Sequence, residues 1–350
     1  TTEITFVGDV VLEDTSFYTV DSEIVNFLRR ADLSMCNLEA PVIKKEEPIK
    51  KIGPVLHQYE DSISYLNTIG FNAFALANNH ILDHGFDGLK NTLKVIKDAN
   101  MKCYGAHIDS EKIYEPFVFE KNNLKVAIFS ASEYHVNCGC DMHYAWLFSR
   151  KLIENIKHYR KKCDYIIINC HGGLELVPLP LPEFRQKYHE LCDIGVDVVI
   201  GHHPHCIQGV EHYKNSIIFY SLGDFLWKFK DNKHHFKSLM VILTLDPHKS
   251  IQYELVFCER VNNQIIVSKS NYDPIMKELS SFNSDIYIDL VNQQCLHVSK
   301  EYLFDYVNRV NQKIESKMSL FHKLKTIIKY IFFKKKNIKH RMMLNDHLKN

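Results

Sequence analysis

The chain has 350 residues, 45% of them hydrophobic, and a formal net charge of +1 at pH 7. This length and composition are ordinary for a globular protein with one large domain or two smaller ones. No run approaches the roughly 20 apolar residues of a membrane-spanning helix, which excludes an integral membrane protein of that kind. The ten cysteines show no regular spacing, so we expect free thiols in a reducing cytoplasm.

Strand-like apolar runs alternate with helix-like periodic segments through the first two hundred residues. In one such segment Leu89, Leu93 and Ile96 fall on one helix face, and Asn100 suits the helix end. This alternation predicts an α/β architecture with right-handed crossovers. Helices are expected near residues 21–30, 61–70, 87–99, 150–162 and 182–194.

Antiparallel strands are predicted as well. The runs 117–119 and 124–130 flank a turn at 121–123. From residue 273 to about 312 the pattern becomes helical. The number of antiparallel runs suggests a second, more antiparallel sheet packed on the first. The other runs of this kind are 208–220, 239–245, 253–258 and 265–268.

Six short polar clusters directly follow apolar runs that read as buried strands. Loops that leave the carboxyl ends of strands in an α/β sheet converge on one edge, where ligands bind. Clusters rich in Asp, Glu, Asn and His therefore predict one shared polar site. The clusters are Gly8-Asp9, Asn37-Leu38-Glu39, Asn78-Asn79-His80, His171 to Glu175, Gly201 to His205 and Ser221 to Phe225.

The residue types in these clusters predict a divalent-metal centre. Carboxylate, amide oxygen and imidazole are the ligands of divalent transition metals, and two ions about 3.5 to 4 Å apart need a bridging carboxylate and terminal imidazoles. Two carboxylates against four positive charges would leave a cationic centre, which favours an anionic phosphoester and activates water as the nucleophile. We expect two ions of Mn, Fe or Zn, held by Asp9, Glu39, Asn79, His171, His203 and His205.

His80 directly follows the expected ligand Asn79, so it can face the substrate while Asn79 faces the metal. We assign it as the general acid for the leaving oxygen. Asp83, three residues later, is expected to hold the imidazole of His80 in one tautomer and orientation.

Each cluster alone also has a structural explanation. A Gly-Asp after a strand is most often a turn, an Asn-Asn-His is most often a capped helix start, and a His-Pro-His is usually loop surface. Their occurrence together at strand ends, in this order, favours the metal site.

In these motifs the sequence resembles the bacterial capsule synthesis CapA or PGA-cap family, a branch of the calcineurin-like metallophosphoesterases. The resemblance covers roughly Ile4 to Phe225, and its most specific matches are the Asn-Asn-His-x-x-Asp-x-Gly motif from Asn78 and the Gly-x-His-Pro-His motif from Gly201. It implies a four-layer α/β/β/α sandwich, with two mixed sheets between helices and a two-metal site at one edge. It also implies a role in making a bacterial surface polymer, poly-gamma-glutamate or a polysaccharide.

Three departures from the family pattern bear on the substrate. The family usually has Trp in place of Gly172, Asn in place of Asp224, and often a basic residue a few positions after the Gly-Asp, where this chain has Glu13-Asp14. These changes reshape the pocket rather than the metal ligands, so the substrate stays open. The remaining polar residues of the motifs are expected to contact the substrate: Asn78, Glu175, His202 and Asp224.

A segment near the C-terminus differs from the rest in charge. Residues 317–341 carry nine basic residues and no acidic one, and the remaining 34 basic and 42 acidic residues leave a net charge of −8. Between 320 and 332, apolar residues at helical spacing are interleaved with lysines, which is typical of a helix lying on an anionic membrane surface. A solvated helix docked on the domain, or a disordered tail, is the main alternative. No nucleic-acid partner is expected, because no aromatic stacking pattern accompanies the charge.

The location follows from the start of the chain and from this basic segment. Membrane-anchored extracellular members of the family carry an N-terminal helix, whereas this chain opens on Thr1-Thr2-Glu3 directly before its first predicted strand. We therefore expect no signal peptide and a cytoplasmic protein, peripheral on the inner face of the cell membrane.

We expect a CapA-like metallophosphoesterase domain over residues 1–270, a helical extension packed on it over 271–312, and a basic amphipathic tail over 313–350. The expected activity is metal-dependent hydrolysis of an anionic phosphoester or polymer-linked substrate in capsule or exopolysaccharide biosynthesis, with capsule assembly proteins as partners. The alternative is a non-catalytic, metal-containing scaffold or polymer-binding subunit of a capsule assembly complex.

Overall fold

The computed structural model describes residues 1–51, 54–133, 143–227, 237–248, 250–269, 291 and 293–295. The chain divides into two units, Thr1–Val291 and Asn292–Asn350, and nearly all described residues belong to the first. The basic tail and almost all of the predicted helical extension lie outside the described residues. The expected domain boundaries at 270 and 312 therefore stay predictions.

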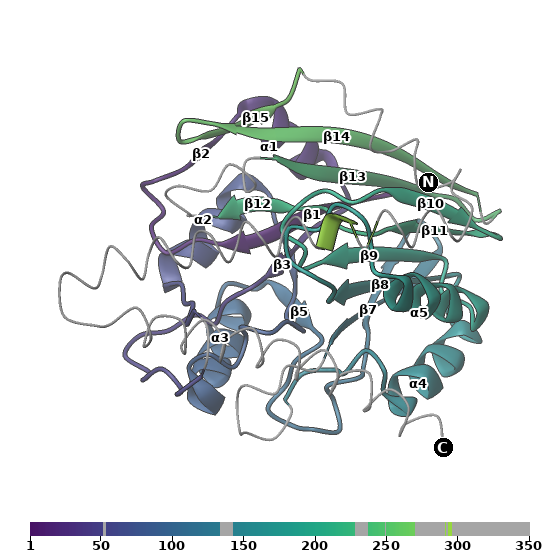
Figure 1. Ribbon diagram of the computed structural model, residues 1–350, viewed down its shortest axis with the longest axis horizontal. Helices are drawn as coiled ribbons and strands as arrows, with labels where there is room; N and C mark the ends of the chain where they lie inside the picture. Colours follow the sequence, from purple (N-terminus) through teal and green to yellow (C-terminus); the bar gives the residue numbers. More distant parts are fainter. Residues whose placement is uncertain are drawn as a thin grey trace. The chain divides into compact units, whose positions relative to one another are not determined.

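Two β-sheets pack face to face in the first unit (Figure 1). Apolar side chains from both sheets fill the space between them, including Phe6, Met35, Ile128, Ile167 and Phe219. In the described residues one sheet has nine strands, in the order β2 (Thr19–Val20), β15 (Gln264–Val267), β14 (Ile251–Val261), β13 (Lys237–Leu245), β1 (Thr2–Val11), β3 (Leu33–Leu38), β4 (Ala73–Ala75) and β5 (Lys102–Tyr104), with β12 (Asp224–Trp227) also paired to β1. The other has six, in the order β10 (Val210–Tyr213), β11 (Ser216–Phe219), β9 (Val198–His202), β8 (Tyr165–His171), β7 (Leu124–Ser132) and β6 (Phe117–Lys121).

Helices cover the outer face of each sheet. Apolar residues of the first three helices join the outer side of the nine-stranded sheet in one core, while the last two helices contact β8 and β9. This arrangement confirms the four-layer α/β/β/α sandwich of the calcineurin-like metallophosphoesterase fold (Figure 1). The helices are α1 (Ser22–Arg30), α2 (Glu60–Ile69), α3 (Gly85–Asp98), α4 (Arg150–Arg160) and α5 (Pro182–Asp193).

The five helices lie within two residues of their predicted limits, because local signals define their ends. The Asp21 and Ser149 side chains accept hydrogen bonds from backbone N–H groups at the starts of α1 and α4. Gly70, with φ at 119°, ends α2 in the left-handed conformation that glycine adopts freely. Pro182 opens α5, where its missing N–H costs no helical hydrogen bond.

The expected second sheet packed on the first is present, but the antiparallel runs are divided between the two sheets. Strands β13, β14 and β15 extend the nine-stranded sheet antiparallel to β1, and β6 and β10 are antiparallel edge strands of the six-stranded sheet. Both sheets are therefore mixed. In the nine-stranded sheet, β13 pairs antiparallel with the first half of β1 and β12 pairs parallel with the second half. The run 208–220 is also two strands, β10 and β11, joined by a turn at Lys214 with φ at 54°.

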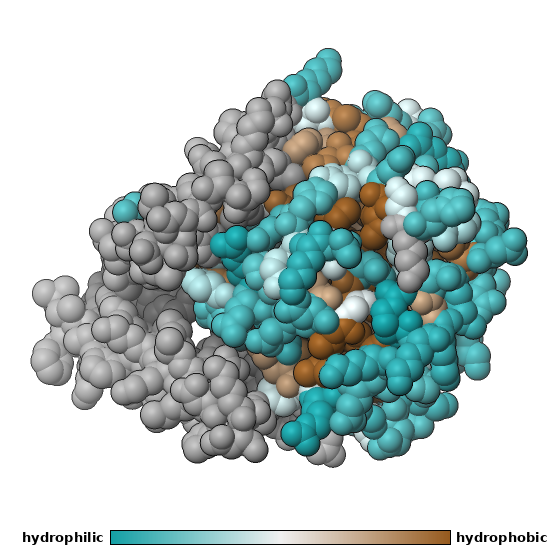
Figure 2. Space-filling view, turned by 90° about the vertical axis from the view of Figure 1, so that its right-hand side faces the viewer, coloured by the Kyte–Doolittle hydropathy of each residue, from teal (hydrophilic) through white to brown (hydrophobic). Residues whose placement is uncertain are grey.

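On the coloured part of the face that carries α4 and α5, polar residues are the most extensive, with hydrophobic residues visible between them (Figure 2). No helix in the described part of the chain is long and apolar enough to cross a membrane. The eight cysteines that the structure describes are free thiols, as expected.

Candidate metal centre

The six predicted metal ligands meet at one edge of the sandwich and come from both sheets. Asp9 lies in β1, Glu39 directly follows β3, and Asn79 lies in the loop after β4. His171 is the last residue of β8, and His203 and His205 follow β9. The carboxyl ends of neighbouring parallel strands thus bring together residues up to 196 positions apart.

Asp9 lies inside its strand rather than at the strand end, at the point where the register of β1 shifts against β3 and β12. Such irregularities re-aim side chains. Its Oδ1 accepts a hydrogen bond from Asn37 Nδ2 (2.9 Å), and its Oδ2 accepts one from His203 N (3.1 Å). Burial alone would raise the pKa of Asp9, but its contacts with His202, His205 and Asn37 lower it to about 2.

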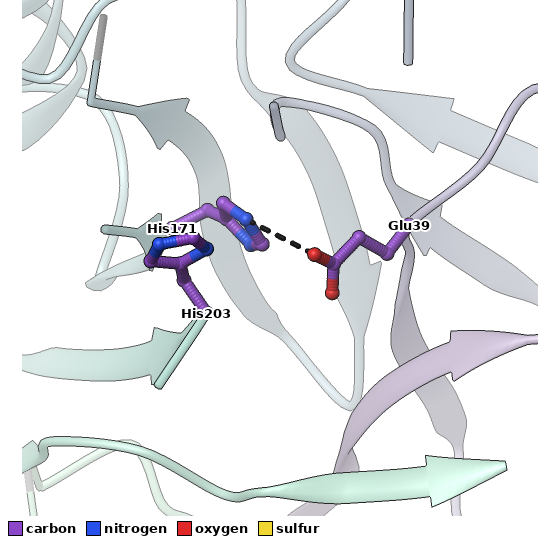
Figure 3. Close-up of side chains that lie close together, drawn as sticks. All are labelled: Glu39, His171 and His203. Carbon is purple, nitrogen blue, oxygen red and sulfur yellow. Dashed lines mark ion pairs between the residues drawn. The ribbon is translucent and has the colours of Figure 1, made fainter. Parts of the chain in front are cut away.

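Glu39, His171 and His203 form one group of metal-type donors, with one donor atom from each within 4.8 Å of the others. Both imidazoles lie beside the Glu39 carboxylate, and His171 Nε2 is 3.4 Å from Glu39 Oε1 (Figure 3). Asn79 Oδ1 lies 2.8 Å from the same His171 nitrogen. Three of these four side chains are buried, and Asn79 is half-buried.

Asp9, His205 and Asp224 form a second group of the same kind. His205 Nδ1 lies 2.8 Å from Asp224 Oδ1 and 3.6 Å from Asp9 Oδ2. Burial would lower the pKa of His205, but the hydrogen bond and charge of Asp224, with the charge of Asp9, raise it to about 9.

Glu39 belongs to the first group and also lies beside His205 of the second. Its Oε1 is 3.4 Å from His171 Nε2 and 3.7 Å from His205 Nε2. This oxygen accepts no hydrogen bond from the described residues. Burial raises the pKa of Glu39 well above its usual value, and the charges of Asp9 and Asp224 raise it further. A buried carboxylate of this kind is stabilised by a bound cation, so the residues fit divalent metal.

The loop after β9 holds its two histidines in unusual backbone conformations. His203 has φ at 93° and His205 has φ at 54°, and residues other than glycine rarely adopt positive φ values. Strain of this kind persists where surrounding contacts over-determine it, and it is common at functional sites. The bond from His203 N to Asp9 is one such contact.

His80 and Asp83 are in contact, as predicted. His80 Nδ1 donates to Asp83 Oδ2 (2.6 Å), and Leu56 N donates to the same oxygen (2.7 Å). Lys51, which sequence reasoning missed, forms an ion pair with Asp83 Oδ1, and its Nζ lies 3.2 Å from His80 Nδ1. Burial lowers the pKa of His80, Asp83 opposes this, and the charges of Lys51 and His205 lower the pKa further.

The four residues expected to contact substrate occupy different places. Asn78 is buried and donates to Asn37 Oδ1 (3.2 Å) and Leu38 O (2.9 Å). Glu175 is exposed, and its charge raises the pKa of both Glu39 and His205, so it faces the centre from outside. His202 and Asp224 are buried, and Asp224 belongs to the second donor group.

His202 is held by Asp9 Oδ1, 2.9 Å from Nδ1, and by Asn169 Oδ1, 3.2 Å from Nε2. Asn169 lies within an apolar strand, so a polar residue type at that position was the sole sequence signal that it contacts the site. Asn37, quoted in its cluster but given no role, has its amide nitrogen near Asp9 Oδ1 and 3.2 Å from His171 Nδ1. These residues orient the predicted ligands.

The place of the family's usual Trp is filled by another side chain. A Cβ on Gly172 would lie 2.7 Å from Phe184 Cε1 and 3.0 Å from Glu133 Cβ. Phe184 belongs to α5 and is 5% exposed. The glycine therefore leaves room for a buried ring rather than for a cavity.

Comparison with known proteins gives this geometry a family. The model of the bacterial capsule synthesis protein PGA_cap family matches residues 3–228, which include all the predicted ligands. The chain belongs to this family. The match agrees with the sequence resemblance.

Two curated relatives are named for capsule or PGA biosynthesis. The capsule biosynthesis protein CapA of Bacillus anthracis is 28% identical over 245 residues, covering 64% of this chain and 59% of the relative. The PGA biosynthesis protein CapA of Bacillus subtilis (strain 168) is 25% identical over 245 residues, covering 63% and 62%. This chain spans about three fifths of the length of these curated relatives.

Two solved structures resemble the fold at low identity. A hypothetical protein from Thermus thermophilus has a TM-score of 0.47 at 10% identity, covering 74% of this chain and 100% of that one. A 5'-nucleotidase from Candida albicans has a TM-score of 0.45 at 12% identity, covering 85% and 59%. Likenesses at this level do not bear on activity.

Proposed function

We propose that this PGA_cap protein is a metal-dependent hydrolase that acts on a phosphoester bond during synthesis of a bacterial capsule or poly-gamma-glutamate-like polymer. The observation that carries the proposal is the position of Glu39 between His171 of the first donor group, 3.4 Å away, and His205 of the second, 3.7 Å away. A carboxylate in that position is what a pair of divalent ions needs as a bridge.

The donor set supports two ions. Glu39, Asn79, His171 and His203 would hold one, and Asp9, Glu39 and His205 the other. Imidazole with carboxylate suits Mn, Fe or Zn. Divalent ions bound there would supply Lewis-acid activation of water and of a phosphoryl oxygen.

We assign proton donation to the leaving oxygen to His80. Since Nδ1 donates to Asp83, Nε2 is the nitrogen left to give a proton to the leaving oxygen. His80 senses the charge of His205, which supports its placement beside the centre. Asp83 and Lys51 fix the ring.

The biological role rests on the relatives. Two of them are named for capsule or PGA biosynthesis, and a capsule polymer or its phosphoester-linked precursor is the substrate class that we propose here. A protein that binds both ions without turnover would instead be a scaffold or polymer-binding subunit.

Metal content measured beside a phosphoester screen tests the proposal. We expect about two ions of Mn, Fe or Zn per chain after reconstitution, and hydrolysis that chelation abolishes. His203→Ala and His205→Ala should lower the ion content. His248→Ala is the control, because His248 is exposed in the turn after β13. The end of β13 pairs with the start of β1, whereas Asp9 lies toward the other end of β1. A wild-type protein that holds no ion would refute the proposal.

A further inference from the structure

Two glycine-aspartate pairs, Gly8-Asp9 and Gly223-Asp224, lie against each other where β1 and β12 run side by side. Asp9 and Asp224 are paired in the parallel register, and Asp9 N donates to Gly223 O (2.9 Å). A Cβ on Gly8 would lie 1.9 Å from Gly223 O, so only glycine permits this approach. The backbone therefore places a second carboxylate beside the predicted ligand Asp9.

The Asp224 carboxylate contacts one imidazole of the centre. Its side chain has no exposed area, and its Oδ1 lies 2.8 Å from His205 Nδ1. An ionised carboxylate can only accept a hydrogen bond, so this contact places a proton on Nδ1. In the neutral ring the other nitrogen, Nε2, then carries the lone pair, and it lies 3.7 Å from Glu39 Oε1.

We propose that Asp224 is a positioning residue of the metal centre: it holds His205 in the tautomer whose Nε2 faces Glu39, and it does not itself bind an ion. This inference rests on the proposed function, because it requires metal at the two donor groups. Hydrogen-bond partners of metal-binding imidazoles fix the ring and raise its basicity, and losing them typically weakens metal binding about 10- to 100-fold.

Strand β12 holds the His205 ring at a second point. Trp227, three residues after Asp224, packs on the imidazole with ring centroids 4.6 Å apart. The family's usual Asn in place of Asp224 would present either an oxygen or an NH₂ group to the ring, and so would allow either tautomer. The carboxylate in this chain allows one.

Metal titration of a variant series tests the role. Mn²⁺ binding is measured by equilibrium dialysis and elemental analysis on wild type, Asp224→Asn and Asp224→Ala. Asp9→Asn serves as the ligand variant. Glu175→Gln serves as the charge control, because it removes a negative charge near the centre from an exposed residue.

We expect wild type and both Asp224 variants to reach the same content at saturating Mn²⁺, about two ions per chain. Affinity should fall in the order Asp, Asn, Ala, by about 10- to 100-fold for Ala, and Glu175→Gln should change it less. Asp9→Asn should lose ion content at saturation. Loss of one ion at saturation in both Asp224 variants would make Asp224 a ligand, and unchanged affinity in both would remove any role; either result overturns the proposal.

The tautomer itself can be read without metal. In metal-free protein carrying ¹⁵N-labelled histidine, at a pH above the raised pKa of His205 where the ring is neutral, the resonance that is absent from His205→Gln should report a protonated Nδ1 in wild type and lose that signature in Asp224→Ala. A protonated Nε2 with a bare Nδ1 in wild type would overturn the inference. A wild type that binds no ion would refute the proposed function, whereas the tautomer measurement would still decide whether Asp224 sets the tautomer of His205.

Discussion

Asp83 Oδ2 accepts a hydrogen bond from His80 Nδ1 at 2.6 Å, while the other oxygen of the same carboxylate pairs with the Lys51 ammonium. All three side chains are at least nine-tenths buried. The imidazole is therefore held at one nitrogen by a carboxylate that is itself held on both sides. His80 Nε2 is the nitrogen through which a proton can pass to a leaving group.

Removing the His80 imidazole should separate proton transfer from metal binding. His80→Ala is expected to keep its metal yet lose roughly 10² to 10⁴ in turnover on esters with poor leaving groups. Turnover of activated aryl esters should fall less, because their leaving groups need less proton donation. Kinetics on both ester types, with metal analysis of the same sample, measure this. An equal loss on both would point to a ligand or orienting role instead.

Removing the Lys51 ammonium should destabilise the fold. Lys51→Met leaves the Asp83 carboxylate buried without its cation, which should lower the free energy of unfolding by about 3 to 5 kcal/mol. Urea unfolding of metal-free protein measures this. Lys50→Met is the control, because residue 50 is exposed, and Asp83→Asn in the Lys51→Met background should recover part of the loss. Equal stabilities of the two lysine variants would contradict the buried pair.

A side chain at position 172 should collide with Phe184. Gly172→Ala is expected to lower the free energy of unfolding by about 1 to 3 kcal/mol, because the new methyl group overpacks a buried site. The cost should shrink in the Phe184→Leu background, where the ring is gone. A double-mutant cycle by urea unfolding gives the coupling, and purely additive effects would show that the two positions do not meet.

The Arg185 and Glu211 pair should make stability depend on pH in the acid range. Arg185 donates twice to the Glu211 carboxylate (3.0 and 2.7 Å), and Tyr220 Oη donates once (2.6 Å). Burial would raise the pKa of Glu211, but these bonds and the charge of Arg185 lower it below its usual 4.5. The pair's contribution is therefore present above pH 4.5 and lost as the pH falls through the lowered value.

Comparing wild type with Glu211→Gln tests that sign. The difference in unfolding free energy should be largest near neutrality and shrink below pH 4.5. The exposed Glu183→Gln controls for loss of a negative charge nearby. A difference that grows toward acid pH would reverse the assignment.

The basic segment 317–341 is proposed to hold the protein on an anionic membrane. Its nine basic residues, at roughly 1 kcal/mol each near such a surface, set an upper limit that screening reduces. Truncation after Gln312 should abolish binding to anionic liposomes and leave metal content and hydrolysis of small esters unchanged. Neutral liposomes are the control. Full-length protein that does not sediment with anionic liposomes at low salt would exclude the anchor.

Local sequence signals were enough to predict the helices and the side chains that gather at the sheet edge. Periodicity and capping residues act over a few positions, so α1 to α5 were predicted almost to the residue. The contact between His80 and Asp83 was also predictable, since three positions separate them. The pairing of β13 with β1 could not be predicted, because it joins residues more than 200 positions apart.

The sequence was sufficient to identify the side chains that could bind metal. The hydrogen-bond and ion-pair partners of these side chains depend on packing between distant segments. Lys51 lies in a charged stretch that reads as solvated surface, yet the fold buries its ammonium against Asp83, 32 positions away. Asp224 was predicted to contact substrate, and its contact with His205, which depends on the pairing of β1 with β12, was not predicted. Short-range preferences fix which residues can end a strand, but the partner of a buried charge depends on which segments the tertiary fold brings together.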